Sequence, residues 1–135
     1  MKAAPFEYIR ATTIGDVFEA YAKFGEDAQI IAGGQSLMPI LNMRLATPKA
    51  LVDINDLSEL TGITKSNGAI RIGSLTRIRE LISAPEVAEY APLLTLATPH
   101  IAHPAIRNRG TIGGSLCHAD PAAELPACII AVDGR

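Results

Sequence analysis

The sequence lacks long hydrophobic runs, and its charges do not gather into blocks of one sign. A membrane-spanning helix needs about 20 consecutive apolar residues, and no stretch of this chain reaches that length. The first residues, MKAAPFEYIRATT, also lack the apolar segment of a secretory signal. We therefore predict a cytoplasmic protein without a membrane span.

Cysteine and net charge are also scarce. The two cysteines, Cys117 and Cys128, could pair, but a chain without a signal peptide normally keeps its thiols reduced. We predict two buried, unpaired thiols. The 12 basic and 14 acidic residues give a net charge of -2, which leaves no electrostatic footprint for nucleic acid. An anionic ligand would need a local site.

The chain has the size of one ordinary domain, with 135 residues of which 48% are hydrophobic. Thr13 and Asp16 predict the capped start of a helix over 14–24, which Gly25 ends. The apolar stretches AQII (28–31) and ALVDI (50–54) predict short strands of a small βαβ unit.

Beyond the second strand the pattern changes. Two alternating stretches, 63–65 and 69–72, surround Ser-Asn-Gly and predict a hairpin. Thr76 is expected to cap a short helix over 77–82, and a further helix is expected near 93–97. The composition predicts two lobes joined near 55–60, and the final CIIAVDGR indicates an apolar element followed by a turn into further chain.

Two glycine pairs are the main candidates for a binding site. Gly33 and Gly34 follow an apolar strand and precede Ser36, and a second pair, Gly113 and Gly114, precedes Ser115. Glycine clusters mark positive φ angles or a close approach of the backbone. Successive N–H groups in such turns form a concave anion site, which can hold a diphosphate without many cations. Each pair alone is also compatible with a simple turn.

Familiar nucleotide motifs do not fit these segments. The first has no Lys-Ser or Lys-Thr after its glycines, so it is not a P-loop, and AGGQSL does not match the dinucleotide fingerprint. Any nucleotide is therefore bound in another way.

Metal and hydrolase chemistry lack the necessary residues. His100 and His103, with Cys117 beside His118, could be drawn as a zinc site, but no standard ligand spacing is present. We interpret the histidines as polar residues that hydrogen-bond buried turns. Ser115 has no nucleophile-elbow sequence around it and no acid clearly placed to orient a base.

Two acidic residues follow the second glycine pair. Asp120 before Pro121 predicts the start of a helix, in whose first turn Glu124 would lie. The alternative role of Glu124 is to accept hydrogen bonds from a ligand hydroxyl.

The segments AGGQSLMPILNMRLATPKALVDIN and IRNRGTIGGSLCHADPAAELPA together resemble the FAD-binding medium subunit of the molybdenum hydroxylases, the family of xanthine dehydrogenase and aerobic carbon monoxide dehydrogenase. The resemblance runs from Phe6 and Tyr8 to the last residue. It implies an α+β fold of the p-cresol methylhydroxylase type, with a first FAD-binding lobe over 1–56 and a second over 57–135. Family members continue for roughly as many residues again, so the second lobe is expected to be incomplete.

The resemblance also implies cofactor-binding residues. These are Ile30, Ile31, Ala32, Gly33, Gly34, Gln35, Ser36 and Leu37 around the diphosphate from the first lobe, Thr111, Ile112, Gly113, Gly114 and Ser115 from the second, Ile101 against the flavin, and Glu124. Many relatives carry asparagine at the position of Ser115 and the shorter aspartate at that of Glu124.

The function implied is electron transfer. A large molybdenum subunit, with its molybdenum-pterin cofactor, would oxidise an organic substrate, and a small subunit with two [2Fe-2S] clusters would pass the electrons on. FAD on this subunit would deliver them to NAD, oxygen or a quinone. This chain would carry no catalytic residue and no metal ligand of its own. The competing hypothesis is a shortened, folded module that has lost the flavin and its partners.

Overall fold

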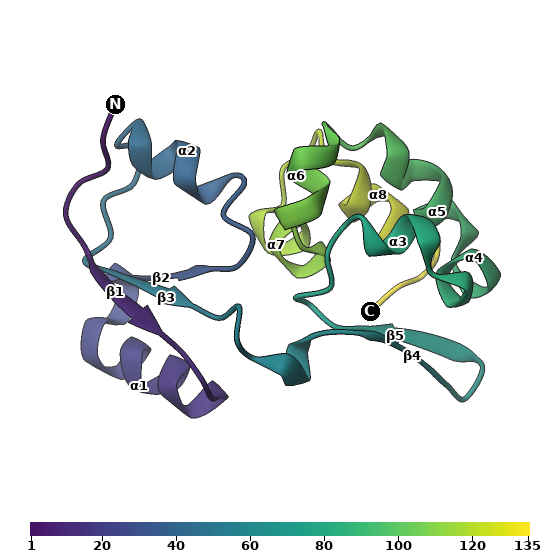
Figure 1. Ribbon diagram of the computed structural model, residues 1–135, viewed down its shortest axis with the longest axis horizontal. Coiled ribbons are helices and arrows are strands. Elements are labelled where there is room, and N and C mark those ends of the chain that lie inside the picture. The colour runs from purple at the N-terminus through teal and green to yellow at the C-terminus, as the bar shows by residue number, and fades with distance from the viewer. The chain divides into compact units, whose positions relative to one another are not determined.

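The computed structural model describes residues 1–135, which form two compact units, Met1–Ser58 and Glu59–Arg135. We call them unit 1 and unit 2. Their separation is a property of the fold, whereas the assignment of either as an FAD-binding lobe stays a prediction. The fold is of the α+β class (Figure 1).

Unit 1 is built on a three-stranded parallel sheet. Its strands are β1 (Glu7–Arg10), β2 (Ala28–Ile31) and β3 (Ala50–Asp53), in the order β1-β3-β2. Asp53 at the end of β3 pairs with Arg10 on one side and Ile31 on the other, so the three strands end at one edge. Strand β1, with exposed side chains at three of its four positions, is not among the sequence predictions.

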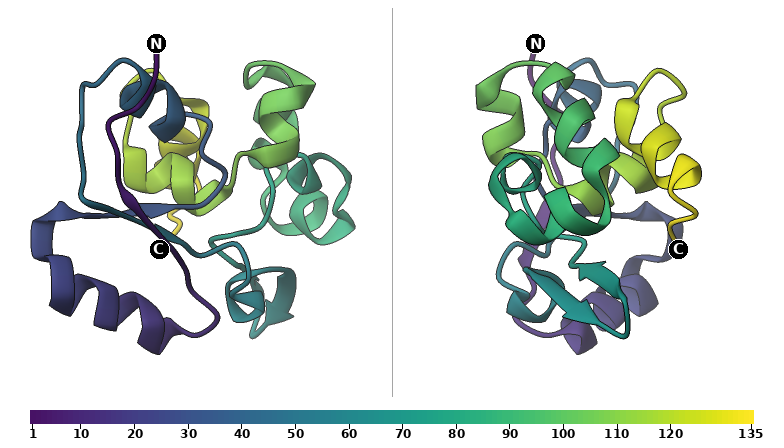
Figure 2. Two further views of the ribbon diagram at one scale, coloured as in Figure 1. Left: turned by 60° about the vertical axis from the view of Figure 1, so that its left-hand side comes forward. Right: turned by 90° about the vertical axis from the view of Figure 1, so that its right-hand side faces the viewer.

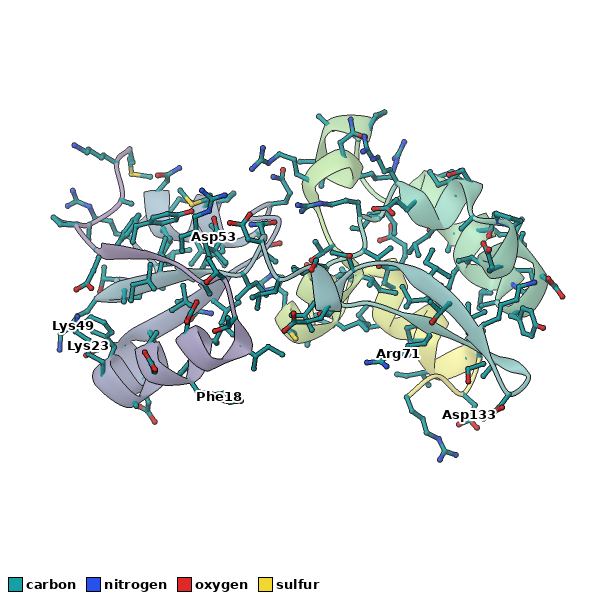
Figure 3. All side chains as sticks on the ribbon, turned by 60° about the horizontal axis from the view of Figure 1, so that its bottom comes forward. Phe18, Lys23, Lys49, Asp53, Arg71 and Asp133 are labelled. Atoms are coloured by element: carbon teal, nitrogen blue, oxygen red, sulfur yellow. The ribbon has the colours of Figure 1, made fainter.

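Helices lie on both sides of this sheet. Helix α1 (Ile14–Phe24) and helix α2 (Leu37–Asn42) flank it on opposite sides (Figures 1 and 2). Phe18 points away from the sheet on the outer side of α1 (Figure 3). A short 3-10 turn, η1 (Gly25–Asp27), joins α1 to β2, and η2 (Ser58–Leu60) follows β3.

The start of α1 is as predicted from the sequence. The Thr13 hydroxyl accepts a hydrogen bond from the Asp16 N–H at 3.2 Å, and the Asp16 carboxylate accepts from the Thr13 N–H at 3.0 Å. This reciprocal capping box supplies acceptors for N–H groups that a helix start leaves without partners. Gly25 at the C-terminal end has a positive φ of 57°. The apolar inner face buries Ala20 beside Ala28 and Val52 of the sheet.

Unit 2 combines a hairpin with a cluster of short helices. Strands β4 (Ile63–Ser66) and β5 (Ala69–Ile72) are antiparallel and are joined by Asn67 and Gly68, both with positive φ. That pair suits a two-residue hairpin turn, and the predicted hairpin is confirmed. The hairpin lies along one side of the helices (Figures 1 and 2).

The helices of unit 2 enclose one hydrophobic core, in which Leu81, Leu94 and Leu125 are fully buried. They are α3 (Glu80–Ser83), α4 (Pro85–Tyr90), α5 (Pro92–Ala97), η3 (Thr98–His100), α6 (Pro104–Arg109), α7 (Ile112–His118) and α8 (Glu124–Ala131). Helix α5 confirms the helix expected near 93–97. None of the helices in the protein is long and apolar enough to cross a membrane.

Two predicted helix starts are wrong. The buried Thr76 hydroxyl donates to the Gly62 carbonyl at 3.1 Å instead of capping a helix, and α3 begins only at Glu80. Helix α8 begins at Glu124 and not after Asp120, whose carboxylate accepts from the Ala122 N–H at 2.9 Å in a turn. In both cases a good capping residue satisfies a different backbone group.

Candidate functional site

The first glycine segment leaves the carboxyl edge of the sheet in unit 1. Strand β2 ends at Ile31, residues 32–36 form a loop, and α2 begins at Leu37. In sheets of parallel strands, ligands bind outside the carboxyl ends of the strands. The loop therefore occupies the position from which such a sheet presents a binding site.

Gly34 gives this loop its special backbone. Its φ is 69°, a conformation that residues with a Cβ rarely adopt. A Cβ there would lie 3.3 Å from Ile31 Cδ1 and from Met38 Cγ, both atoms of flexible side chains. The conformation, more than the available space, is what requires glycine.

The loop offers backbone donors. The N–H groups of Gly34, Gln35 and Ser36 make no hydrogen bond to another group of the chain. Residues 30–37 contain no cationic side chain. Any anion held here would therefore be bound through backbone N–H groups, the arrangement expected of an anion-binding turn.

A polar network holds the loop in place. The Asn55 side-chain amide donates to the Ala32 carbonyl at 2.8 Å and to the Asp53 carboxylate at 2.7 Å. Tyr8 on β1 donates its hydroxyl to the same carboxylate, which lies at the end of β3 (Figure 3). Inside the loop, the Gln35 amide donates to the Gly33 carbonyl at 2.9 Å. These contacts connect all three strands to the glycine segment.

The charge of Asp53 is stabilised by the same contacts. Burial alone would raise the pKa of Asp53, but hydrogen bonds from Tyr8 and Asn55, with the nearby Arg10, outweigh burial and lower the pKa. Asp53 is therefore an ionised acceptor for both donors at neutral pH. This network is not among the sequence predictions, although an Asp at the end of a buried strand with an Asn two residues later could have indicated it.

The second glycine segment, in unit 2, is of a different kind. The Ile112 N–H donates to the Thr76 carbonyl at 3.1 Å, and the Gly113 N–H donates to the Ser74 carbonyl at 2.9 Å. The Gly114 N–H donates to the Thr111 hydroxyl at 3.1 Å, which caps α7. All three N–H groups thus have acceptors within unit 2, unlike those of Gly34, Gln35 and Ser36 in the first segment.

Close packing explains the glycines of this second segment. A Cβ on Gly113 would lie 2.6 Å from Ser74 Cβ and 2.7 Å from Ser74 O. A Cβ on Gly114 would lie 2.8 Å from the Thr111 hydroxyl. Neither glycine has a positive φ. Gly113 allows the start of α7 to lie against the chain after β5, and Gly114 leaves room for the Thr111 cap.

Three further candidate residues lie in unit 2. Ile101 follows η3, is half-buried, and packs against the hydrophobic core of the unit. Glu124 opens α8, so its predicted place in the first turn of a helix is confirmed. Its half-buried carboxylate makes no hydrogen bond or ion pair within the chain. Ser115 is half-buried one turn into α7.

Histidine and cysteine differ from expectation. His100, His103 and His118 are all exposed, so the interpretation that they hydrogen-bond buried turns is wrong. No three or more His, Cys, Asp or Glu side chains are grouped to hold a metal ion. Both cysteines are unpaired, but Cys117 is exposed and only Cys128 is buried, which corrects the prediction of two buried thiols.

Comparison with protein families gives one match over nearly the whole chain. Residues 4–135 match the family described as "FAD binding domain in molybdopterin dehydrogenase". The chain is 50% identical over 133 residues to the alpha subunit of the 6-hydroxypseudooxynicotine dehydrogenase complex of Paenarthrobacter nicotinovorans. That alignment covers 98% of this chain and 45% of the relative.

Solved structures give the same result. The carbon monoxide dehydrogenase of Hydrogenophaga pseudoflava that lacks the Mo-pyranopterin moiety matches with a TM-score of 0.94 and 42% identity, over 97% of this chain and 46% of that chain. Quinoline 2-oxidoreductase from Pseudomonas putida 86 matches with a TM-score of 0.89 and 44% identity, over 93% and 44% of the two chains. The chain thus spans less than half the length of the relatives it matches.

Proposed function

Because this chain belongs to the family of FAD-binding domains in molybdopterin dehydrogenases, we propose that it binds FAD as part of an electron-transferring medium subunit. The loop after β2 carries the proposal: it combines unengaged backbone donors, a positive φ at Gly34, and a position at the carboxyl edge of a parallel sheet. The family match supports FAD as the ligand for such a loop.

In unit 1, residues 30–37 would hold the diphosphate. The N–H groups of Gly34, Gln35 and Ser36 are the donors for its oxygens, and Gly34 permits the backbone conformation that exposes them. Ile30, Ile31 and Leu37 anchor the two ends of the segment in β2 and α2. The Asn55 contact with the Ala32 carbonyl keeps the loop in this conformation without the ligand. Such preorganisation reduces the ordering required on binding.

In unit 2, residues 111–115 would contribute differently. Because the N–H groups of Ile112, Gly113 and Gly114 are already bonded, this segment would present its glycine backbone surface and the Ser115 hydroxyl. The unpaired Glu124 carboxylate would accept a hydrogen bond from a hydroxyl of the cofactor. Ile101 would pack its exposed part against the flavin ring.

The wider function follows from the family. FAD, when bound, supplies reversible redox chemistry, and the protein supplies binding, orientation and electrostatics. In the intact enzyme, electrons would come from a small iron-sulfur subunit with [2Fe-2S] clusters, itself reduced by a large subunit holding a molybdenum-pterin cofactor. The acceptor would be NAD, oxygen or a quinone. The designation of one relative as a subunit of a dehydrogenase complex supports such an assembly.

A matched pair of glycine variants tests the proposal. Gly34→Ala and Gly25→Ala each place alanine at a positive φ, 69° and 57°, in the same unit. A Cβ on Gly25 would meet nothing within 4 Å, and Gly25 lies before β2 whereas Gly34 follows it. Strain at each is on the order of 1–3 kcal/mol. Stability should therefore fall in both variants, but FAD affinity only in Gly34→Ala.

The measurement is titration of the purified protein with FAD, followed by flavin fluorescence. We expect about a tenfold or larger increase in Kd for Gly34→Ala and little change for Gly25→Ala. Absence of FAD binding by the wild-type protein would refute the proposal. Equal Kd values for the two variants would show that the loop is not part of the FAD-binding site.

A further inference from the structure

The side chain of Arg107 makes hydrogen bonds to three backbone carbonyls of the turn between α5 and α6. Arg107 Nη1 lies 2.7 Å from the Ile101 carbonyl oxygen, 3.0 Å from that of Ala102 and 3.2 Å from that of Pro99. Arg107 is the fourth residue of α6, and helical side chains lean toward the N-terminus of their helix. The guanidinium therefore reaches back over the turn that precedes its own helix.

The hydrogen bonds of the Arg107 side chain all serve this turn. Its guanidinium makes no ion pair, and all of its side-chain hydrogen bonds go to the three backbone carbonyls. Arg107 lies in the last turn of α6, where the helix dipole favours a cation, but its guanidinium reaches back to the carbonyls of the turn that precedes the helix. The side chain therefore acts on the turn.

These contacts fix the backbone on both sides of Ile101. The Ile101 N–H donates to the Thr98 carbonyl at 3.1 Å, and the Ile101 carbonyl accepts from Arg107. Because hydrogen bonds hold the peptide groups on both sides of Ile101, its φ and ψ stay at -72° and 106°. The direction of its side chain from the backbone is then set as well.

The next residue shows that the turn needs such support. Ala102 has a φ of 42°, in the left-handed region that disfavours a residue with a Cβ. Conformations of this kind persist only where surrounding contacts over-determine them. The carbonyls of Ile101 and Ala102, one before and one after the strained Cα atom, are both bonded to Arg107.

We propose that Arg107 is a positioning residue, which holds the turn at 99–102 so that Ile101 meets the flavin ring in one orientation. The proposal rests on the function proposed above for Ile101. Arg107 itself touches no cofactor in this arrangement. Its effect on the flavin passes through the backbone of the turn and the Ile101 side chain.

The first measurement needs no flavin. In the ligand-free protein, hydrogen exchange of the Ile101 amide should become at least about tenfold faster in Arg107→Gln, because the charge-assisted hydrogen bonds from Arg107 to the three carbonyls of the turn are lost. Arg109→Gln is the matched control, since it lies on the same helix and its side chain makes no hydrogen bond or ion pair in the chain. Exchange in the control should equal that of the wild type.

The second measurement uses the flavin-loaded protein. Arg107→Gln should raise the Kd for FAD by about tenfold and alter the visible absorption band of the bound flavin, whereas Arg109→Gln should change neither. Because Arg107 acts through Ile101, adding Arg107→Gln to Ile101→Ala should leave the absorption band of the single Ile101→Ala variant unchanged. A purely structural role would instead lower stability without this dependence on Ile101.

The outcomes separate the two proposals. If the wild-type protein binds no FAD, the proposed function fails, and the role of Arg107 toward the flavin fails with it whatever the exchange result. If FAD binds but Arg107→Gln has the exchange rate, Kd or absorption band of Arg109→Gln, only the positioning role is overturned. Should the glutamine variant not fold, Arg107→Lys is expected to show the same changes at smaller size, and wild-type values in that variant would overturn the proposal.

Discussion

Gly113→Ala should destabilise unit 2 strongly, although alanine is a better helix former than glycine. The φ of Gly113 is not positive, so the alanine backbone is allowed and the penalty is purely steric. Its Cβ would lie 2.6 Å from Ser74 Cβ and 2.7 Å from Ser74 O, closer than real Cβ contacts come. The neighbouring atoms belong to the Cβ and backbone of Ser74, not to a flexible side-chain end. Helix α7 or the chain at 74–76 must therefore move.

The size of the effect follows from two losses. Overpacking in a well-packed region costs about 1–3 kcal/mol. Moving α7 away also stretches the 2.9 Å hydrogen bond from the Gly113 N–H to the Ser74 carbonyl, worth about 0.5–1.5 kcal/mol. We expect a fall of about 2–4 kcal/mol in the free energy of unfolding. For a folding unit of 60–100 residues this corresponds to a Tm lower by about 10–30 °C.

Urea unfolding followed by circular dichroism measures this change. Gly15→Ala is the control, since Gly15 lies in the first turn of α1 with Thr13 Oγ1 as its nearest neighbour at 3.4 Å. That variant should be as stable as the wild type or more stable, by up to about 1 kcal/mol. A Gly113→Ala protein within about 0.5 kcal/mol of the wild type would refute the packing explanation.

Two further predictions concern unit 1. Asn55→Ala removes the donor to the Ala32 carbonyl, so it should lower the free energy of unfolding by about 1 kcal/mol and weaken FAD binding. The control is Asn42→Ala on the exposed end of α2, which should change neither. Hydrogen bonds from the Thr12 backbone, and then from Thr13, lower the pKa of Asp16 from 3.8 to about 2. A lowered Asp pKa stabilises the fold above the ordinary pKa and ceases to do so as the pH falls through the folded value. Urea unfolding should therefore show a stability difference between wild type and Asp16→Asn that is constant above about pH 5 and disappears toward pH 2.

Short sequence patterns were sufficient to predict elements that are stabilised by residues close together in the chain. The capping box of Thr13 and Asp16 involves residues three apart, and the Asn67–Gly68 turn needs only two residues that accept positive φ. The burial of ALVD, and the partial burial of AQII on the neighbouring strand, also agree with their apolar character. For each of these elements, the deciding interaction lies within the element or on its buried face.

The sequence was insufficient to predict elements whose conformation depends on a residue far away in the chain. Thr76 has the chemistry of a helix cap, but its hydroxyl donates to the Gly62 carbonyl, which the hairpin brings close. Strand β1 exposes most of its side chains and is held by backbone pairing with β3, so it lacks an apolar pattern. Asn55 and Arg107 likewise support backbone carbonyls at positions that only the folded chain defines.

The two glycine pairs show how one motif can arise from two physical requirements. Gly34 is required by a positive φ in a loop with unengaged N–H groups, whereas Gly113 is required by a neighbouring backbone 2.7 Å from where its Cβ would stand. In the sequence, both appear as a glycine pair with a serine one or two residues further on. Their substitutions should nevertheless diverge: alanine at Gly34 should reduce both FAD affinity and stability, and alanine at Gly113 should mainly reduce stability. Comparison of Gly34→Ala with Gly25→Ala separates binding from folding at the first pair, whereas a loss of flavin in Gly113→Ala would accompany an altered fold.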